Sequence, residues 1–450
     1  MHMRENRMNE QGANIDWSRY HDQLSSCRSF RLQGRIVKLA GIVAEANGPG
    51  LGVGSLCSIE SEPGHNIRAE VVGFNDRRLI LMPFGELRGV RPGSRVVGIC
   101  SSPAMPVGEA YLGRVIDGLG LPIDGKGNVR AEDEYPLYGN PINPLRRGII
   151  REVMDVGVRA INAMVTLGKG QRIAVMAGSG VGKSVLMGMM ARNTAADVSI
   201  IALIGERGRE VREFIENKLG GSGLKKSIVV AATSDAPALV RIRSAYVATT
   251  LAEYFRDKGA DVLLVMDSIT RVAMSLREIG LAAGEPPTAK GYTPSVFSRL
   301  PKLLERAGNI EKKGSVTGIY NVLVEGDDMN EPVADSVRSI VDGHIVLSRA
   351  IAHRGHYPAI DVPASISRVM KDITGADHLA RARKAVKTLT TYREAEDLIN
   401  IGAYADGSDP DIDFAKKMIG KINAFLQQDI NQKVGFDESI SQLNSLFGAN

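Results

Sequence analysis

Short apolar runs in the middle of the chain alternate with longer stretches that have helical periodicity. Such runs are typical of strands buried on both faces of a parallel sheet. We therefore expect βαβ units over residues 101–370, an α/β core whose sheet is covered by helices on both faces. The runs cover residues 173–176, 199–204, 228–231, 262–266, 317–324 and 344–347, and helical stretches such as 183–194 and 238–257 lie between them.

A different pattern precedes this core. Over residues 28–100, β-like runs are separated by frequent glycines, and many short strands with turn signals predict a small β-barrel. The runs cover residues 35–40, 68–74, 78–83 and 95–99.

Residues 1–27 form a polar tail ahead of the barrel. Its apolar residues Ile15, Trp17, Tyr20 and Leu24 lie about three to four positions apart, which places them on one side of a short helix. A frayed terminus with chance spacing is the alternative.

The pattern changes again after the core. Residues 371–450 contain no clear strand. Residues 377–388 and 411–425 have the periodicity of amphipathic helices, with a loop at 406–410 between them. We expect a helical C-terminal domain.

Composition narrows the class of protein. The 450 residues, 44% hydrophobic and 24% charged, are enough for two or three globular domains. Lys and Arg number 56 against 51 Asp and Glu, and the net charge of +5 does not indicate a polyanion-binding surface. Cys27, Cys57 and Cys100 have no close spacing, which excludes a disulfide framework and a CxxC metal site. With no signal-peptide pattern and no apolar run long enough to span a bilayer, we expect a cytosolic protein.

A phosphate-binding motif follows the run at 173–176. Residues 177–184 read AGSGVGKS and open the next helix, which is the strand–loop–helix context of a P-loop. Glycines let backbone N–H groups face phosphate oxygens, Lys183 adds a cation, and the Ser184 hydroxyl is a Mg²⁺ ligand. Ala177 replaces the usual first glycine, where a small side chain is tolerated. The expected binding residues are Gly178, Ser179, Gly180, Val181, Gly182, Lys183 and Ser184.

Two carboxylates follow other predicted strands. Asp267 ends the run at 262–266, which is a Walker B pattern able to hold Mg²⁺, although a strand-end or helix-capping Asp looks the same. Glu206 follows the run at 199–204 and should lie at the same edge of the sheet as Lys183. A carboxylate there can orient and deprotonate water. Without further context, a solvated charge run is the more common reading of residues 205–210.

Several segments resemble known proteins. Residues 205–211, 232–237, 252–257, 112–117 and 122–124 are similar to catalytic subunits of the rotary ATP synthase superfamily. Residues 155–162, 284–287, 326–332 and 342–349 resemble the type III protein-export ATPases within that superfamily. The variants at 290–292 and 326–328 are closer to the flagellar branch than to the virulence-secretion branch. The resemblance extends over residues 31–425.

This resemblance implies a fold and a function. The fold is a RecA-like P-loop ATPase core with an N-terminal β-barrel and a C-terminal helical domain, assembled as a homohexameric ring. The function is Mg²⁺-dependent ATP hydrolysis that energises flagellar protein export by a cytoplasmic enzyme attached peripherally to the inner-membrane export gate. The implied partners are a cytosolic regulator or stator that binds the N-terminal tail, a central stalk protein, membrane proteins of the gate, and export chaperones with their cargo, but no nucleic acid.

Other functions remain as alternatives. A virulence-secretion ATPase shares most of the motifs. A hexameric RNA translocase is disfavoured because the N-terminal region shows little interleaving of aromatic and basic residues. A non-catalytic ring subunit of a rotary ATPase is disfavoured by Glu206, because such subunits usually lack the catalytic carboxylate. Residues 405–411 are poorer in glutamate than the acidic lever segment of the synthases, which puts rotor coupling of the synthase kind in doubt.

The resemblance also implies residue roles. Glu206 is the base that activates water, and Lys183, Arg207 and Arg368 complete the catalytic set, with Arg368 as an arginine finger reaching the neighbouring subunit. Ser184 and Asp267 match Mg²⁺ positions, with Glu210 as a further carboxylate near the metal, and Arg271 lies near the phosphates. Tyr357 stacks on adenine. The alternatives are a packed loop residue for Tyr357 and, for Arg368, a surface arginine paired with Asp372. Phe436 is a candidate for completing the adenine pocket, and Ile430 stands where a second ring is expected.

Overall fold

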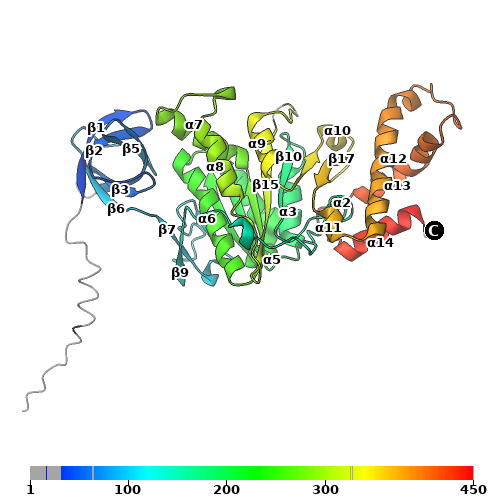
Figure 1. The fold of residues 1–450 in the computed structure, drawn as a ribbon, viewed down its shortest axis with the longest axis horizontal. Coiled ribbons are helices and arrows are strands. Elements are labelled where there is room, and N and C mark those ends of the chain that lie inside the picture. The colour runs from blue at the N-terminus through cyan, green and yellow to red at the C-terminus, as the bar shows by residue number, and fades with distance from the viewer. Residues whose placement is uncertain (1–16, 18–31, 63–64, 325, 327, 449–450) are drawn as a thin grey trace, which may run out of the picture.

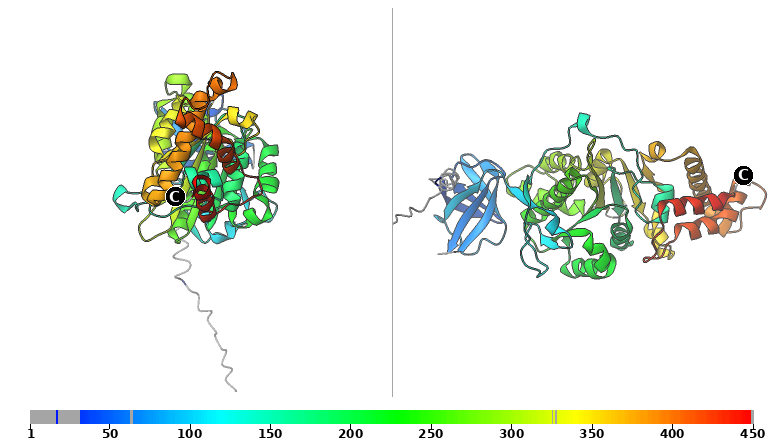
Figure 2. Two further views of the ribbon diagram at one scale, coloured as in Figure 1. Left: turned by 90° about the vertical axis from the view of Figure 1, so that its right-hand side faces the viewer. Right: turned by 90° about the horizontal axis from the view of Figure 1, so that it is seen from below.

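The computed structural model describes residues 17, 32–62, 65–324, 326 and 328–448. The chain forms an elongated row of three parts, with a barrel at one end, an α/β core in the middle and helices at the other end (Figures 1 and 2). This arrangement confirms the predicted fold class. The tail expected over residues 1–27 lies outside the described residues except for Trp17, so its predicted role stays untested.

The first part is a closed six-stranded barrel with the strand order β1-β2-β5-β4-β3-β6. Alternate residues such as Ile59, Val71 and Leu81 fill its interior and are fully buried. Closure removes free strand edges, which explains how such short strands form a stable unit. The strands are β1 (Gln33–Ala40), β2 (Val43–Asn47), β3 (Leu56–Glu62), β4 (His65–Asn75), β5 (Arg78–Pro83) and β6 (Arg95–Cys100).

The core is a mainly parallel sheet with the order β17-β16-β10-β15-β13-β11-β12-β8. β14 (Gly308–Asn309) pairs with β15, and β7 (Ala104–Val107) and β9 (Asp133–Pro136) form a separate two-stranded sheet. The main strands are β8 (Val115–Asp117), β10 (Arg172–Ala177), β11 (Val198–Glu206), β12 (Ser227–Thr233), β13 (Asp261–Asp267), β15 (Ser315–Leu323), β16 (Gly343–Leu347) and β17 (Ile360–Ser367).

Helices cover both faces of this sheet, as the apolar runs predict. Val262, Leu264 and Met266 of β13 join one hydrophobic cluster, and Leu263 and Val265 join another, because successive side chains point to opposite faces. Figure 1 shows α6 (Ala238–Asp257), α7 (Ile269–Ala282) and α8 (Pro294–Leu304) on one side of the sheet and α3 (Lys183–Asn193) on the other. The remaining α-helices described in the core are α2 (Arg159–Met164), α4 (Gly208–Glu213), α5 (Gly220–Lys225), α9 (Pro332–Ile340) and α10 (Arg349–His353).

The strands β8, β14 and β17 of this sheet were not predicted, and β17 shows why. β17 pairs antiparallel with β16 at the edge of the sheet. Its sequence contains Pro363, and after Val362 none of its side chains is fully buried. An edge strand tolerates proline because one side of its backbone is unpaired. The run at 344–347 is therefore followed by one more strand before the core ends.

The C-terminal part is helical, as expected. It contains α11 (Met370–Ile373), α12 (Ala376–Asn400), α13 (Pro410–Leu426) and α14 (Phe436–Phe447). The carboxylate of Asp409 accepts hydrogen bonds from the N–H groups of Asp411 and Ile412, which caps α13. α12 continues well past residue 388, and α14 was not predicted. Among the described residues, no helix combines the length and apolar character that a membrane span requires.

Candidate active site

The P-loop connects β10, an interior strand of the sheet, to the start of α3. Gly180 has φ 80° and Gly182 has φ 88°, a left-handed conformation that glycine adopts at little cost. Gly182 is the residue that precedes the first turn of α3, so the loop delivers the chain to a helix N-terminus. Free N–H groups at such a terminus attract anions.

A cavity of about 540 Å³ lies in front of this loop. It is formed where β10, β11 and β13 end, because the carboxyl ends of parallel strands meet at one edge of the sheet. The structure therefore brings together residues that the sequence analysis assigned to phosphate, metal and water. Those residues are Gly178, Ser179, Gly180, Gly182, Lys183, Ser184, Glu206, Arg207, Glu210, Asp267 and Arg271.

Lys183 pairs with a buried carboxylate inside the cavity. Its Nζ lies 3.0 Å from Oδ1 of Asp267 and 4.0 Å from Oε1 of Glu206. The Asp267 side chain is only 2% exposed. Oδ1 of Asp267 also accepts a hydrogen bond of 2.6 Å from Nδ2 of Asn321 in β15. Sequence analysis missed Asn321, whose only signal was an amide within the apolar run at 317–324.

Glu206 and Glu210 form a pair of interacting carboxyl groups. Burial raises the pKa of Glu206 to about 7, with further contributions from the charge of Asp267 and a hydrogen bond to Glu210. The same hydrogen bond is the main reason that the pKa of Glu210 is lowered, so the proton stays on Glu206, which donates. A carboxyl that titrates near neutrality is well matched to general-base chemistry.

Arg207 contacts the Glu206–Glu210 pair through a hydrogen bond to Glu210. Its Nη1 donates a hydrogen bond of 3.0 Å to Oε1 of Glu210, and its side chain is 77% exposed. Glu210 thus contacts Glu206 and Arg207, and its role near a metal stays a prediction.

Arg271 in α7 provides a partly buried cation that lines the cavity. A Cβ on Gly205 would lie 2.9 Å from Cγ of Arg271, so only glycine lets the two approach at the end of β11. Within the described structure, Nε of Arg271 is buried and has no hydrogen-bond partner. Because Arg271 lines the cavity, its guanidinium charge suits an anionic ligand there.

The donor set also fits Mg²⁺. The Ser184 hydroxyl and the Asp267 carboxylate offer the oxygen ligands that this cation prefers. The described residues contain no cluster of three or more His, Cys, Asp or Glu that could hold a metal. Mg²⁺ is usually bound by one or two protein groups together with substrate phosphates, so the sparse donor set fits an ion that arrives with a nucleotide.

An apolar pocket of about 480 Å³ adjoins the phosphate cavity. Gly180, Gly182 and Val185 line both spaces, so a single ligand can occupy them together. The Tyr357 ring lies over Gly182, where a Cβ would be 3.5 Å from Cε1 of the ring, and Tyr357 is 48% exposed. The pocket is lined further by Val181, Leu186, Met189, Leu347, Pro358, Ala359, Gln428, Asp429 and Ile430.

The C-terminal segment closes this pocket. Ile430 lies in its wall, as anticipated, but Phe436 does not line it. Phe436 instead begins α14 and packs edge-on against His378, with ring centroids 5.9 Å apart. Gln428 was missed by sequence analysis. Its backbone N–H donates to the Tyr357 carbonyl at 3.0 Å, and its side-chain Oε1 accepts from the N–H of Arg159 at 2.7 Å.

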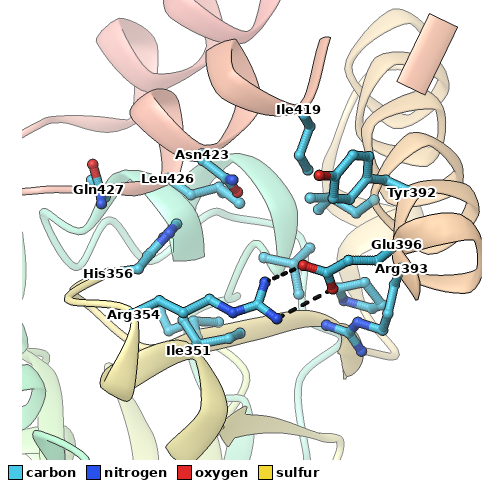
Figure 3. A pocket seen from close by; sticks show the side chains of 14 residues that line it. Ile351, Arg354, His356, Tyr392, Arg393, Glu396, Ile419, Asn423, Leu426 and Gln427 are labelled. Carbon is cyan, nitrogen blue, oxygen red and sulfur yellow. Dashed lines mark hydrogen bonds and ion pairs between the residues drawn. The ribbon is translucent and has the colours of Figure 1, made fainter. Parts of the chain in front are cut away.

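A smaller pocket of about 210 Å³ lies behind the Tyr357 segment, between the core and the C-terminal helices (Figure 3). Arg354 crosses it to Glu396 of α12 at 2.8 Å. His356 and Gln427 line this pocket, and each is the sequence neighbour of a residue that lines the apolar pocket. Its lining residues come from both the core and the C-terminal helices, so we call it the seam pocket. It shares no lining residue with the phosphate cavity.

Arg368 lies away from the chain's own cavity. It follows β17, in which Ser367 pairs with Gly343, the first residue of β16. The Arg368 N–H donates to the Asp342 carbonyl at 2.9 Å, which fixes it at the edge where the parallel strands begin. The P-loop lies at the edge where they end. Arg368 is exposed and, among the described side chains, forms no ion pair, including none with Asp372.

The fold and the site define a P-loop ATPase whose α/β core carries a β-barrel before it and a helical domain after it. Family profiles confirm each part. Those described as "ATP synthase alpha/beta family, beta-barrel domain", "ATP synthase alpha/beta family, nucleotide-binding domain" and "T3SS EscN ATPase C-terminal domain" match residues 36–98, 157–367 and 374–445. The chain belongs to the type III secretion ATPases of the ATP synthase alpha/beta family.

Individual relatives agree with this assignment. The flagellum-specific ATP synthase of Bacillus subtilis (strain 168) is 52% identical over 429 residues, 95% of this chain and 98% of that protein. The type 3 secretion system ATPase of Xanthomonas euvesicatoria is 48% identical over 425 residues, 94% of this chain and 96% of that protein.

Solved structures agree as well. The assembled ATPase EscN of the enteropathogenic E. coli type III secretion system has a TM-score of 0.88 at 44% identity, covering 92% of this chain and 100% of EscN. EscN in complex with its central stalk EscO has a TM-score of 0.85, with the same identity and coverage.

Proposed function

We propose that this protein hydrolyses ATP to energise the export of flagellar proteins through a type III secretion apparatus. The observation that carries the proposal is the cavity in which the P-loop, Lys183 and Glu206 meet beside an apolar pocket roofed by Tyr357. This shape fits a triphosphate joined to a flat apolar base. The 52% identity to a flagellum-specific ATP synthase supports the flagellar assignment.

The chemistry follows from the positions of the side chains. The P-loop N–H groups and Lys183 hold the phosphates, and Arg271 adds a second cation at the cavity wall. Glu206 in its ionised form accepts a proton from water as the water oxygen bonds to the terminal phosphorus and the bond to the ADP oxygen breaks. Ser184 and Asp267 would hold Mg²⁺, which would supply charge neutralisation at the phosphates.

The proposal includes an assembly. We expect a homohexameric ring. The assembled EscN structure supports it, and so does the position of Arg368 near the start of β16, at the edge of the sheet opposite its own P-loop. A central stalk partner is supported by the EscN–EscO complex. The remaining partners stay proposals: a regulator on the N-terminal tail, the export gate at the inner membrane, and chaperones with cargo. The enzyme would then be cytoplasmic and peripheral to that membrane.

Two experiments test this function. The first measures ATP hydrolysis by the purified protein with and without Mg²⁺, and with and without RNA. We expect hydrolysis that requires Mg²⁺ and does not change when RNA is added. Stimulation by RNA would point to a translocase, and a complete lack of hydrolysis would point to a non-catalytic subunit.

The second experiment deletes the gene in the source bacterium and scores flagellar filaments and virulence secretion separately. Loss of secretion with filaments intact would overturn the flagellar assignment.

A further inference from the structure

Asn321 makes a contact that the function proposed above does not assign. It lies in β15, next to β13, and the pairing of Met266 with Tyr320 places Asn321 beside Asp267. The Asn321 side chain is fully buried. Its Nδ2 donates 2.6 Å to Oδ1 of Asp267, the same oxygen that lies 3.0 Å from Nζ of Lys183.

The Asn321 side-chain amide lowers the stability of the core. Oδ1 of Asn321 is buried and has no hydrogen-bond partner within the described structure, and an unsatisfied buried polar atom destabilises a fold by about 1–3 kcal/mol. An aliphatic side chain, like those of Ile319 and Val322 in the same strand, would fill this position without that cost. The donor contact to Asp267 is therefore the feature that accounts for an asparagine here.

Binding of nucleotide changes the partners of Asp267. A P-loop lysine contacts the β- and γ-phosphates, so a bound triphosphate attracts the Lys183 ammonium away from Asp267. A neutral amide buried in the sheet does not follow the phosphate. Asp267, which lines the cavity, would then keep Asn321 as the donor to Oδ1.

We propose that Asn321 is a positioning residue that holds the Asp267 carboxylate in place when nucleotide draws Lys183 to the phosphates, so that the carboxylate stays oriented for Mg²⁺. The inference rests on the proposed function, because it assumes a nucleotide with its cation. Groups that orient a metal ligand typically contribute about 10- to 100-fold in metal affinity or activity.

The test compares Asn321→Leu, similar in volume but without a donor, with Tyr320→Phe as a control. Tyr320 is the preceding buried residue of β15, points to the other face of the sheet and does not line the cavity. Binding of Mn²⁺ to protein saturated with a non-hydrolysable ATP analogue is followed by electron paramagnetic resonance, and binding of a fluorescent ATP analogue is measured without metal. Neither readout needs hydrolysis, so the test stands even if the wild type proves inactive.

Asn321→Leu should raise the Kd for Mn²⁺ by about tenfold or more and leave metal-free nucleotide affinity within about twofold of wild type. Tyr320→Phe should change neither value. If Asn321→Leu does not fold, Asn321→Ala serves, and its melting temperature shows whether the protein is intact. An unchanged Mn²⁺ affinity in a folded variant overturns the proposal. So does an equal loss of metal-free nucleotide binding, which would mean that Asn321 supports the whole cavity rather than Asp267.

Discussion

Nζ of Lys183 lies 3.0 Å from Oδ1 of Asp267 in a cavity where the Asp267 side chain is almost completely shielded from water. We therefore expect the lysine to have two consecutive partners: the Asp267 carboxylate before nucleotide binds and phosphate oxygens afterwards. The pair also keeps a buried charge neutralised until the ligand arrives, and an unpaired buried charge is costly.

Lys183→Ala should abolish ATP hydrolysis, because no other side chain of the P-loop carries a positive charge to the transferred phosphate. The rate of phosphate release should fall below about a tenth of wild type. Lys169→Ala is the matched control, since Lys169 pairs with Glu152 and Asp261 at 2.8 Å and lies outside the cavity lining. A Lys183→Ala protein that keeps more than this rate would contradict an essential role for the charge.

Glu206→Gln should separate ATP binding from hydrolysis. Glutamine keeps the shape and hydrogen bonding of glutamate but cannot accept a proton, so turnover should fall by at least ~10²-fold. ATP affinity, measured with a fluorescent analogue, should stay close to that of the wild type. Weak binding of the analogue by this variant would remove Glu206 from the role of base.

The activity should depend on pH through Glu206. Burial and the neighbouring carboxyls of Asp267 and Glu210 raise its pKa to about 7, and the charge of Lys183 opposes them only in part. A protonated carboxyl cannot act as a base. We therefore expect kcat/KM to fall about tenfold for each pH unit below 7 and to level off above it. A profile that stays flat down to pH 5 would show that ionised Glu206 is not required.

The raised pKa of Glu206 also predicts that Glu206→Gln is more stable than the wild type at high pH. The folded protein holds a proton on Glu206 up to pH 7, whereas the unfolded chain releases it near its ordinary pKa of 4.5, so the charged Glu206 lowers stability as pH rises through this window. Glu206→Gln should therefore melt at a higher temperature than wild type at pH 8. The gain should shrink toward pH 4.5, and differential scanning calorimetry would reveal the opposite trend if the shift had the other sign.

Arg368 should act across a subunit boundary. Lys183→Ala and Arg368→Ala should each be inactive, since a finger arginine contributes roughly 10³–10⁵ in rate. In mixed rings, some interfaces join the intact P-loop of one variant to the intact Arg368 of the other. Activity should partly return when the two are co-assembled. Rings that carry both tags yet remain inactive would place the action of Arg368 elsewhere.

Tyr357→Ala should weaken ATP binding, and Tyr357→Phe should preserve it. Stacking of an aromatic ring on a base is worth about 1–3 kcal/mol, which corresponds to a rise in KM of roughly 5- to 150-fold. Tyr392→Ala is a suitable control because Tyr392 lines the separate seam pocket. Equal KM values for Tyr357→Ala and wild type would favour a packed loop residue, the alternative for Tyr357.

The sequence by itself determined the features that depend on neighbouring residues. A phosphate loop is built from consecutive backbone N–H groups, so residues 177–184 identify it without a fold. The buried strands are visible as apolar runs, and a carboxylate at the end of such a run must lie at the carboxyl edge of a parallel sheet. That reasoning placed Lys183, Glu206 and Asp267 together correctly.

Only the tertiary structure decided the contacts between residues that are distant in sequence. Strand order and register set Asn321 beside Asp267, and the antiparallel direction of β17 carries Arg368 to the edge opposite the P-loop. Packing of the C-terminal helices turned Phe436 to His378 and brought Gln428 to Tyr357. The raised pKa of Glu206 likewise depends on burial, which only packing creates. Periodicity along a chain shows which faces are buried, but the partner of each buried group is settled only when separate elements pack together.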